Sequence, residues 1–147
     1  MGYLRTRPHV IIVDLDVDRV SELQRSAQTV ADVDVCADFA SAHEALLHDP
    51  PDFLVTNIRL GANNGLHLVH LASGATRCIV YMDPEDPFLL REAQRLGAFV
   101  EPLRRLPFSL RAYMRAELPA RDRRDPLRVD RRIVPRGGRR AADVRVA

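Results

Sequence analysis

The chain has 147 residues, which fits one domain of ordinary size with an extension, and all 22 of its basic residues are arginine. Residues 118–147 contain ten arginines against four aspartates, a net charge of +6, which leaves a net charge of −4 for residues 1–117. No apolar run approaches the roughly 18 residues of a membrane span, and the N-terminus lacks the apolar core of a signal peptide. We therefore expect a soluble, cytoplasmic protein.

Short apolar runs alternate with segments of helical periodicity over the first 118 residues. Residues 10–13, Val-Ile-Ile-Val, are typical of a strand buried on both faces of a parallel sheet. Asp16 is a candidate helix N-cap, Pro50 and Pro51 close a helix, and Gly97 ends another. In chain order the pattern predicts strand 10–13, helix 17–29, strand 33–36, helix 39–48, strand 53–55, turn 61–65, helix 66–72, strand 78–82, helix 84–96, strand 98–100 and helix 107–118.

This alternation indicates right-handed βαβ units, and therefore an α/β fold with a parallel sheet covered by helices on both faces. Five strands favour the flavodoxin-like order 2-1-3-4-5, whose functional crevice lies at the carboxyl ends of strands 1 and 3. Residues 119–147 are rich in arginine, poor in large apolar side chains and contain Gly137-Gly138. We expect a domain over residues 1–118 and an arm over residues 119–147 that is flexible or ordered by a partner.

The two cysteines, Cys36 and Cys78, lie in predicted strands. In the expected order two other strands separate them, a gap of about 14 Å at roughly 4.8 Å per strand. That gap exceeds the limit of about 7 Å between the Cα atoms of a disulfide. We therefore predict two buried free thiols.

Particular side chains stand where the predicted strands end. The residues at these ends are Asp14, Leu15 and Asp16 after the first strand, Asn57 after the third, Met82 at the end of the fourth, and Glu101 with Pro102 after the fifth. Gly65 lies eight positions after Asn57. Over residues 9–118 this pattern resembles the receiver domain of two-component response regulators.

The resemblance implies roles for these positions that their side chains do not support. Receivers hold Mg²⁺ with an acidic pair after strand 1 and accept a phosphoryl group on an aspartate after strand 3. They place a Ser or Thr at the end of strand 4 and a lysine after strand 5. In this chain Leu15 stands at the second acidic position, Asn57 at the acceptor, Met82 at the hydroxyl and Glu101 at the lysine.

Each of these differences removes a part of phosphoryl-transfer chemistry. The amide of Asn57 has no nucleophilic oxygen comparable to a carboxylate, and Asp14 has at most Asp16 to help it hold Mg²⁺. Glu101 has the wrong charge to neutralise a transferred phosphoryl group, and Met82 offers no hydroxyl. The resemblance therefore implies a degenerate phosphoacceptor pocket, with no catalytic residue, no metal and no cofactor.

Simpler interpretations of the same residues stay open. Asp14 fits a plain strand-end residue, and Asp16 fits an N-cap better than a ligand. Asn57 and Asn64 fit turns, because asparagine bonds to its own backbone. Met82 fits a core position.

The resemblance also implies a surface for protein contact, because receivers use the face of helix 4, strand 5 and helix 5 to dimerise or to dock partners. Residues 84–117 cover this face. Phe99 is a candidate for the switch aromatic of the family, with core packing as the favoured alternative. The predicted surface residues are Arg91, Glu92, Arg95, Phe99, Arg111 and Arg115.

The function expected from these observations is a stand-alone pseudo-receiver that binds a protein partner, with a homodimer as one form, independently of phosphorylation. The alternative is a regulator that binds nucleic acid through arginines of the arm, of which Arg131, Arg132, Arg139 and Arg140 are the densest. Interspersed aspartates and the absence of aromatic residues in the arm disfavour that alternative. An enzyme is not expected, because no nucleotide-binding loop follows strand 1 and the five histidines form no metal-like cluster with cysteine.

Overall fold

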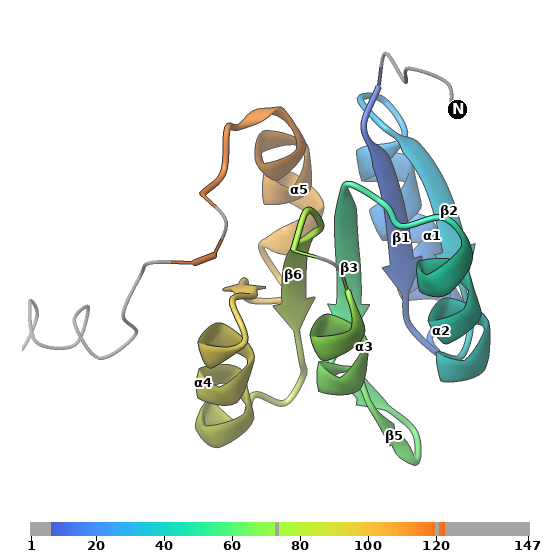
Figure 1. Cartoon of the computed structure of the whole chain (residues 1–147). Helices are drawn as coiled ribbons and strands as arrows, with labels where there is room; N and C mark the ends of the chain where they lie inside the picture. The colour runs from blue at the N-terminus through green and yellow to red at the C-terminus, as the bar shows by residue number, and fades with distance from the viewer. Residues whose placement is uncertain (1–6, 73, 120, 123–147) are drawn as a thin grey trace, which may run out of the picture.

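The computed structural model describes residues 7–72, 74–119 and 121–122. Five parallel strands form one sheet in the order β2-β1-β3-β6-β7, which confirms the predicted topology (Figure 1). Their bounds are β1 His9–Val13, β2 Asp32–Cys36, β3 Phe53–Asn57, β6 Arg77–Tyr81 and β7 Phe99–Val100. The carboxyl ends of all five strands therefore lie at one edge of the sheet.

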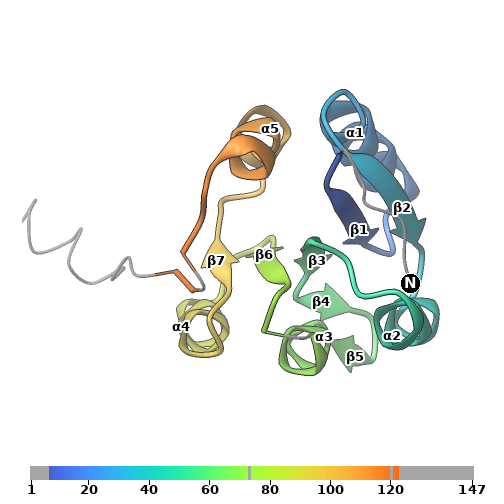
Figure 2. The ribbon, with the colours of Figure 1, turned by 45° about the horizontal axis from the view of Figure 1, so that its top comes forward.

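Helices cover both faces of this sheet, as Figure 2 shows. Helices α1 and α5 lie together on one face, and α2, α3 and α4 lie on the other. Their bounds are α1 Val17–Ala27, α2 Phe39–His48, α3 Leu66–Leu71, α4 Pro87–Arg95 and α5 Leu106–Arg115. The three-layer arrangement follows from strands that are apolar on both faces.

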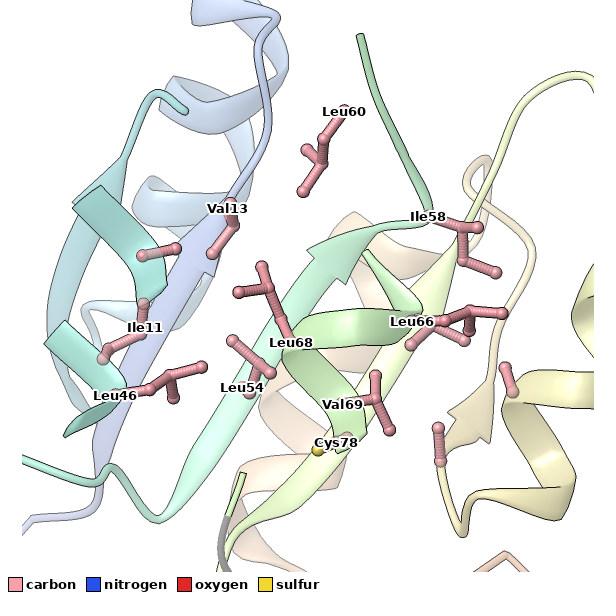
Figure 3. Packing of buried hydrophobic residues seen from close by; sticks show 14 of the residues in the cluster. Ile11, Val13, Leu46, Leu54, Ile58, Leu60, Leu66, Leu68, Val69 and Cys78 are labelled. Atoms are coloured by element: carbon pink, nitrogen blue, oxygen red, sulfur yellow. The ribbon is translucent and has the colours of Figure 1, made fainter. Parts of the chain in front are cut away.

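Alternation along each strand divides the core in two. In β1, Ile11 and Val13 pack with residues of α2, α3 and α4, as Figure 3 shows. Val10 and Ile12 instead pack with residues of α1 and α5. All four side chains are at most 1% exposed. Because successive side chains of a strand point to opposite faces, the face of any strand-end residue follows from its position.

The helix predicted from residue 84 begins three residues later, at Pro87. Asp86 ends the preceding loop, and its Oδ1 accepts a hydrogen bond from the backbone N–H of Phe88 at 2.9 Å. Proline has no N–H to donate and suits the first turn of a helix. The correct start signal was therefore the Asp-Pro pair at 86–87, and the predicted start at Pro84 was wrong.

The turn predicted at 61–65 overlaps a two-stranded hairpin that begins two residues earlier, with strands β4 Arg59–Leu60 and β5 Asn63–Asn64. Gly61 takes a φ of 65° in the two-residue connection, a conformation that glycine adopts without a steric penalty. Leu60 is 2% exposed and belongs to the core on the α2–α4 face. The buried leucine anchors a loop that the sequence pattern showed only as turn-rich.

Gly65 is required by a close approach of two backbone segments. A Cβ atom at this position would lie 2.3 Å from the carbonyl oxygen of Asn57. The N–H of Gly65 donates to the carbonyl oxygen of Ile58 at 2.7 Å. The eight-residue spacing from Asn57 to Gly65 thus reflects direct packing of the start of α3 on the end of β3.

The chain beyond α5 returns to the domain, although residues 119–122 were predicted as part of the arm. An Nη2 of Arg121 donates to the carbonyl oxygens of Arg95 at 2.8 Å and Gln94 at 3.3 Å, at the end of α4. Asp122 is 5% exposed, and its N–H donates to the carbonyl oxygen of Gly97. The packed domain therefore extends at least to Asp122.

Two further predictions concern the described residues. Cys36 and Cys78 are both buried and free, as expected. Burial raises the pKa of the Cys78 thiol to about 12. Over the described part of the chain, no helix has the length and apolar character needed to cross a membrane.

Candidate functional site

Four side chains stand in one row across the carboxyl edge of the sheet. Asn57 pairs with Tyr81 in the register of β3 and β6. Asp14 follows Val13, which pairs with Thr56, and Glu101 follows Val100, which pairs with Val80. The row therefore reads Asp14, Asn57, Tyr81, Glu101 across β1, β3, β6 and β7.

Asp14 is the centre of a buried hydrogen-bond network. Its side chain is 2% exposed. Its Oδ2 accepts from the hydroxyl of Tyr81 at 2.7 Å and from Nδ2 of Asn57 at 3.3 Å. Its Oδ1 accepts from the N–H of Asp16 at 3.1 Å. A carboxylate removed from water costs several kcal/mol unless such partners replace its hydration, so these bonds are what makes the burial of Asp14 tolerable.

Arg19 supplies the positive charge of this network. Its Nη1 lies 3.2 Å from Oδ2 of Asp14, and its Nη2 lies 3.5 Å from Oδ2 of Asp16. Burial by itself lowers the pKa of Arg19, but the hydrogen bond and the charge of Asp14 outweigh this, so the net pKa is raised. The guanidinium thus remains charged and neutralises Asp14 from the side of α1.

Tyr81 is fully buried and stays protonated. Desolvation is the largest cause that raises the pKa of its hydroxyl well above the ordinary value, and the charge of Asp14 and the hydrogen bond to it raise the pKa further. A protonated hydroxyl is a donor, which matches the bond to Asp14. The tyrosine therefore holds one proton at the centre of the site.

The structure places the predicted turn and cap residues as follows. Oδ1 of Asn57 accepts from the N–H of Arg59 at 2.9 Å, so the two ends of this amide join the turn after β3 to Asp14. Asp16 is the N-cap of α1 and accepts from the N–H groups of Asp18 and Arg19. Oδ1 of Asn64 accepts from the N–H of Leu66 at the start of α3. The N-cap and turn interpretations are confirmed.

Two residues of the predicted pocket point elsewhere. Met82 is 1% exposed and packs in the core on the α2–α4 face, so the core interpretation holds for it. Tyr81, one position earlier, is the β6 residue that reaches Asp14. Leu15 is 45% exposed, and its Cδ1 lies 3.3 Å from where a Cβ on Gly61 would stand. Leu15 therefore flanks the hairpin.

Glu101 and Phe99 both face the α1–α5 side. Glu101 is 6% exposed, and its Oε1 accepts from the hydroxyl of Tyr113 at 2.9 Å. Phe99 is 5% exposed and packs edge-on against the ring of Tyr113, with centroids 6.0 Å apart. The prediction that Phe99 belongs to an interaction surface is therefore wrong, and the favoured alternative of core packing is confirmed.

The donor set at this edge does not fit the Mg²⁺ that the fold family implies. Mg²⁺ requires a near-octahedral shell of oxygen ligands, in which one or two accessible carboxylates bind the ion and waters complete the shell. Both oxygens of Asp14 already accept hydrogen bonds, Asp16 caps α1, and the oxygen of Asn57 is taken by Arg59. Across the described ranges, no group of three or more His, Cys, Asp or Glu side chains is arranged to hold a metal ion.

The remaining predicted residues divide between exposed and undescribed positions. On α4 and α5, Arg91, Arg95, Arg111 and Arg115 are exposed, while Glu92 is half-buried and forms an ion pair with Arg95. The candidate nucleic-acid contacts Arg131, Arg132, Arg139 and Arg140 lie outside the described residues.

Sequence reasoning missed Arg19 and Tyr81. A usable signal existed for Tyr81, because alternation puts it on the same face as Ile79, and Asp14 on the same face as Ile12. For Arg19 the signal was its place in the first turn of a helix that begins just after Asp14. The site therefore contains a cation, although not at the position of the family lysine.

No protein-family model and no curated protein sequence matches this chain. Its structure is nevertheless similar to solved receiver domains. The receiver domain of Francisella response regulator 1452 matches with a TM-score of 0.65 at 15% identity, over 74% of this chain and 93% of that one. The BeF3-activated receiver domain of DrrB from Thermotoga maritima matches with a TM-score of 0.64 at 16% identity, over 74% and 94%.

A third similar structure is the receiver domain of response regulator NarL from Mycobacterium tuberculosis, with a TM-score of 0.61 at 16% identity, over 76% of this chain and 98% of that one. At such identities the similarity establishes the fold. The chain has the receiver-domain fold, a flavodoxin-like α/β architecture with strand order 2-1-3-4-5.

Proposed function

We propose that this protein is a signalling module that acts through protein–protein contact and is not switched by aspartyl phosphorylation. The observation that carries the proposal is the buried Asp14 network, in which Tyr81, Asn57 and Arg19 occupy the carboxylate. A receiver that reacts with a phosphodonor must keep its carboxylates open to metal and phosphoryl group. Here the same edge is used to hold the fold together.

The chemistry of the individual groups supports the proposal. Asn57 has no carboxylate oxygen to attack phosphorus, and its amide already bonds to Asp14 and Arg59. Glu101 brings negative charge to the strand end where charge developing on a phosphoryl group needs a cation. Arg19 is engaged with Asp14 and Asp16, so its charge is already balanced.

The proposed contact surface for a signalling partner is the side of the domain formed by α4, the edge strand β7 and α5. It is called the α4–α5 face below. Arg91, Arg111 and Arg115 are exposed there, and Arg95 is exposed while it pairs with Glu92. A surface rich in arginine favours a partner with acidic groups, because guanidinium binds carboxylates through two parallel hydrogen bonds. The same face on a second copy is an arginine surface too, so a homodimer through it requires pairing with Glu92 or Glu117.

Incubation with acetyl phosphate and Mg²⁺ tests the proposal. We expect the intact mass to stay unchanged, while a phosphorylatable receiver treated in parallel gains one phosphoryl group. A gain of one phosphoryl group that hydroxylamine removes would show an acyl phosphate on some carboxylate, and the proposal would then fail. Peptide mapping would identify the acceptor, for which the exposed Asp83 is the first candidate.

A further inference from the structure

Two grooves open at the carboxyl edge of the sheet and share Leu103 and Arg104 as a common wall. The first has a volume of about 360 Å³ and lies between the first turns of α1 and α5, where Asp18, Glu22 and Phe108 line it. The second has a volume of about 430 Å³ and lies between this wall and the β6–α4 loop, which contributes Asp83 and Glu85. Together they form one continuous surface beside the Asp14 network.

This surface is acidic with exposed apolar groups. The carboxylates on its outer walls are Asp16, Asp18, Glu22, Asp83 and Glu85, and all five are exposed. Only Arg19 and Arg104 among the lining residues are cationic, and Arg19 already pairs with Asp14 and Asp16, so four carboxylates face Arg104 alone. Phe108 is 82% exposed at the rim. An occupant of this surface must be basic and must carry some apolar side chains.

Residues 123–147 of the same chain have that composition. They contain nine arginines against three aspartates, a net charge of +6, with Leu127, Ile133 and Val134 interspersed. They continue from Asp122, which is packed against Gly97 at the start of β7. A coil of this length has a root-mean-square span of about 28 Å, which exceeds the roughly 17 Å length of a five-residue strand. The grooves are within reach.

We propose that the arginine-rich residues 123–147 dock in these two grooves of their own chain. Tethering gives a segment an effective concentration in the millimolar range, so an affinity that is weak between separate molecules suffices. The inference is independent of whether the α4–α5 face binds a partner and of whether the chain is phosphorylated.

Paramagnetic broadening in the full-length protein tests the docking. Ala141→Cys introduces a labelling site next to Arg139 and Arg140, and the buried Cys36 and Cys78 do not compete for a nitroxide reagent. With the label in place, we expect the amide signals of residues 16–22 and 103–108 to lose most of their intensity at about 0.05 M salt. They should recover at about 0.5 M salt, since screening weakens contacts between exposed charges. Signals of α2, on the other face, should not change.

Matched variants separate specific docking from general attraction. Glu22→Gln with Glu85→Gln removes two carboxylates from the grooves and should restore the broadened signals at low salt. Glu44→Gln with Glu117→Gln removes two exposed carboxylates elsewhere and should leave the broadening in place. An equal response of the two double variants would overturn the proposal.

Other outcomes also decide the question. Undisturbed groove signals at low salt would overturn docking. A second sample mixes spin-labelled protein that has no isotopic enrichment with isotope-enriched protein that has no spin label. Broadening of the groove signals in this mixture would assign the arm to the grooves of a second copy and would contradict the intramolecular proposal. Salt-sensitive binding of duplex DNA by the full chain, with groove signals unaffected by the label, would assign the arm to nucleic acid instead.

Discussion

The carboxyl edge of the sheet and the α4–α5 face both carry charged side chains, but the two regions hold their charges in opposite ways. At the edge, Asp14 is 2% exposed and bonded to Tyr81, Asn57 and Arg19. On the face, Arg91 and Arg111 are exposed to water. Breaking a buried charge pair typically costs about 3–5 kcal/mol, whereas an exposed pair contributes about 0–1 kcal/mol. The charges at the edge are therefore part of the folded structure, whereas the charges on the face contribute little to its stability.

Substitution of Gly65, whose backbone packs against the end of β3, should cause the largest loss of stability. Gly65→Ala places a methyl group 2.3 Å from the Asn57 carbonyl oxygen, so β3 and α3 must separate. We expect a loss of about 3 kcal/mol in the free energy of unfolding, measured by urea denaturation. Gly74→Ala is the matched control, because no atom lies within 4 Å of the added Cβ and its stability should not fall. A Gly65→Ala variant as stable as the control would contradict the close packing.

A new charge in the row should have the next largest effect. Asn57→Asp replaces an amide donor 3.3 Å from Asp14 by a second carboxylate. The repulsion raises the pKa of the new carboxyl in the folded state, and we expect a loss of about 2 kcal/mol at pH 7.

The sign of the pH dependence follows from that raised pKa. The stability that the variant lacks at pH 7 returns as acid protonates the new carboxyl. The difference in melting temperature between the variant and the parent should therefore narrow as pH falls towards 5. Thermal melts at several pH values measure the gap, and Asn63→Asp on the exposed hairpin is the control. A raised midpoint at neutral pH, or Mg²⁺-dependent phosphorylation of the single variant, would mean that the edge is more open than the structure shows.

Removal of the buried donor should cost less but leave a distinct signature. Tyr81→Phe deletes the 2.7 Å hydrogen bond to Asp14, and we expect a loss of about 1–2 kcal/mol at pH 7. The parent should also lose stability above about pH 10, where tyrosine ionises in the unfolded chain. Burial and Asp14 raise the pKa of Tyr81 in the folded protein, so folding keeps a proton that the unfolded chain releases.

The variant lacks this ionisable group, and its stability should therefore fall less steeply above pH 10. Urea denaturation at pH 7 and at alkaline pH measures both effects. Tyr113→Phe is the comparison, since it also deletes a hydrogen bond to a carboxylate, that of Glu101, but at a side chain that is only half-buried. An alkaline slope identical in the parent and in Tyr81→Phe would show that Tyr81 does not hold its proton.

The α4–α5 face should show the smallest effect on stability. Arg111→Ala and Arg115→Ala remove exposed guanidinium groups, and we expect changes of no more than about 0.5 kcal/mol each. Thermal denaturation checks this. A loss comparable to that of Tyr81→Phe would mean that these arginines support the fold, and the contrast between the two regions would not hold.

The fold was predictable to within a few residues, and the site only in part. Apolar periodicity located the strands and helices, and the Asn57–Gly65 spacing marked a contact that the structure explains by packing. The start of α4 and the hairpin at residues 59–64 were not predicted correctly. At each of these places the local sequence pattern was compatible with two structures, and packing against another element determined which of them formed.

The sequence by itself determined the architecture and the identity of the side chains at the strand ends, because periods of two and 3.6 residues specify which faces must be buried whatever their neighbours are. Only the tertiary structure decided which of those side chains meet. Tyr81 and Asp14 are 67 residues apart, and their hydrogen bond depends on the register of three strands and on the direction of two side chains. The same is true of Glu101, whose partner is Tyr113 of α5. Contacts of this kind are set by packing in three dimensions, which a one-dimensional pattern does not contain.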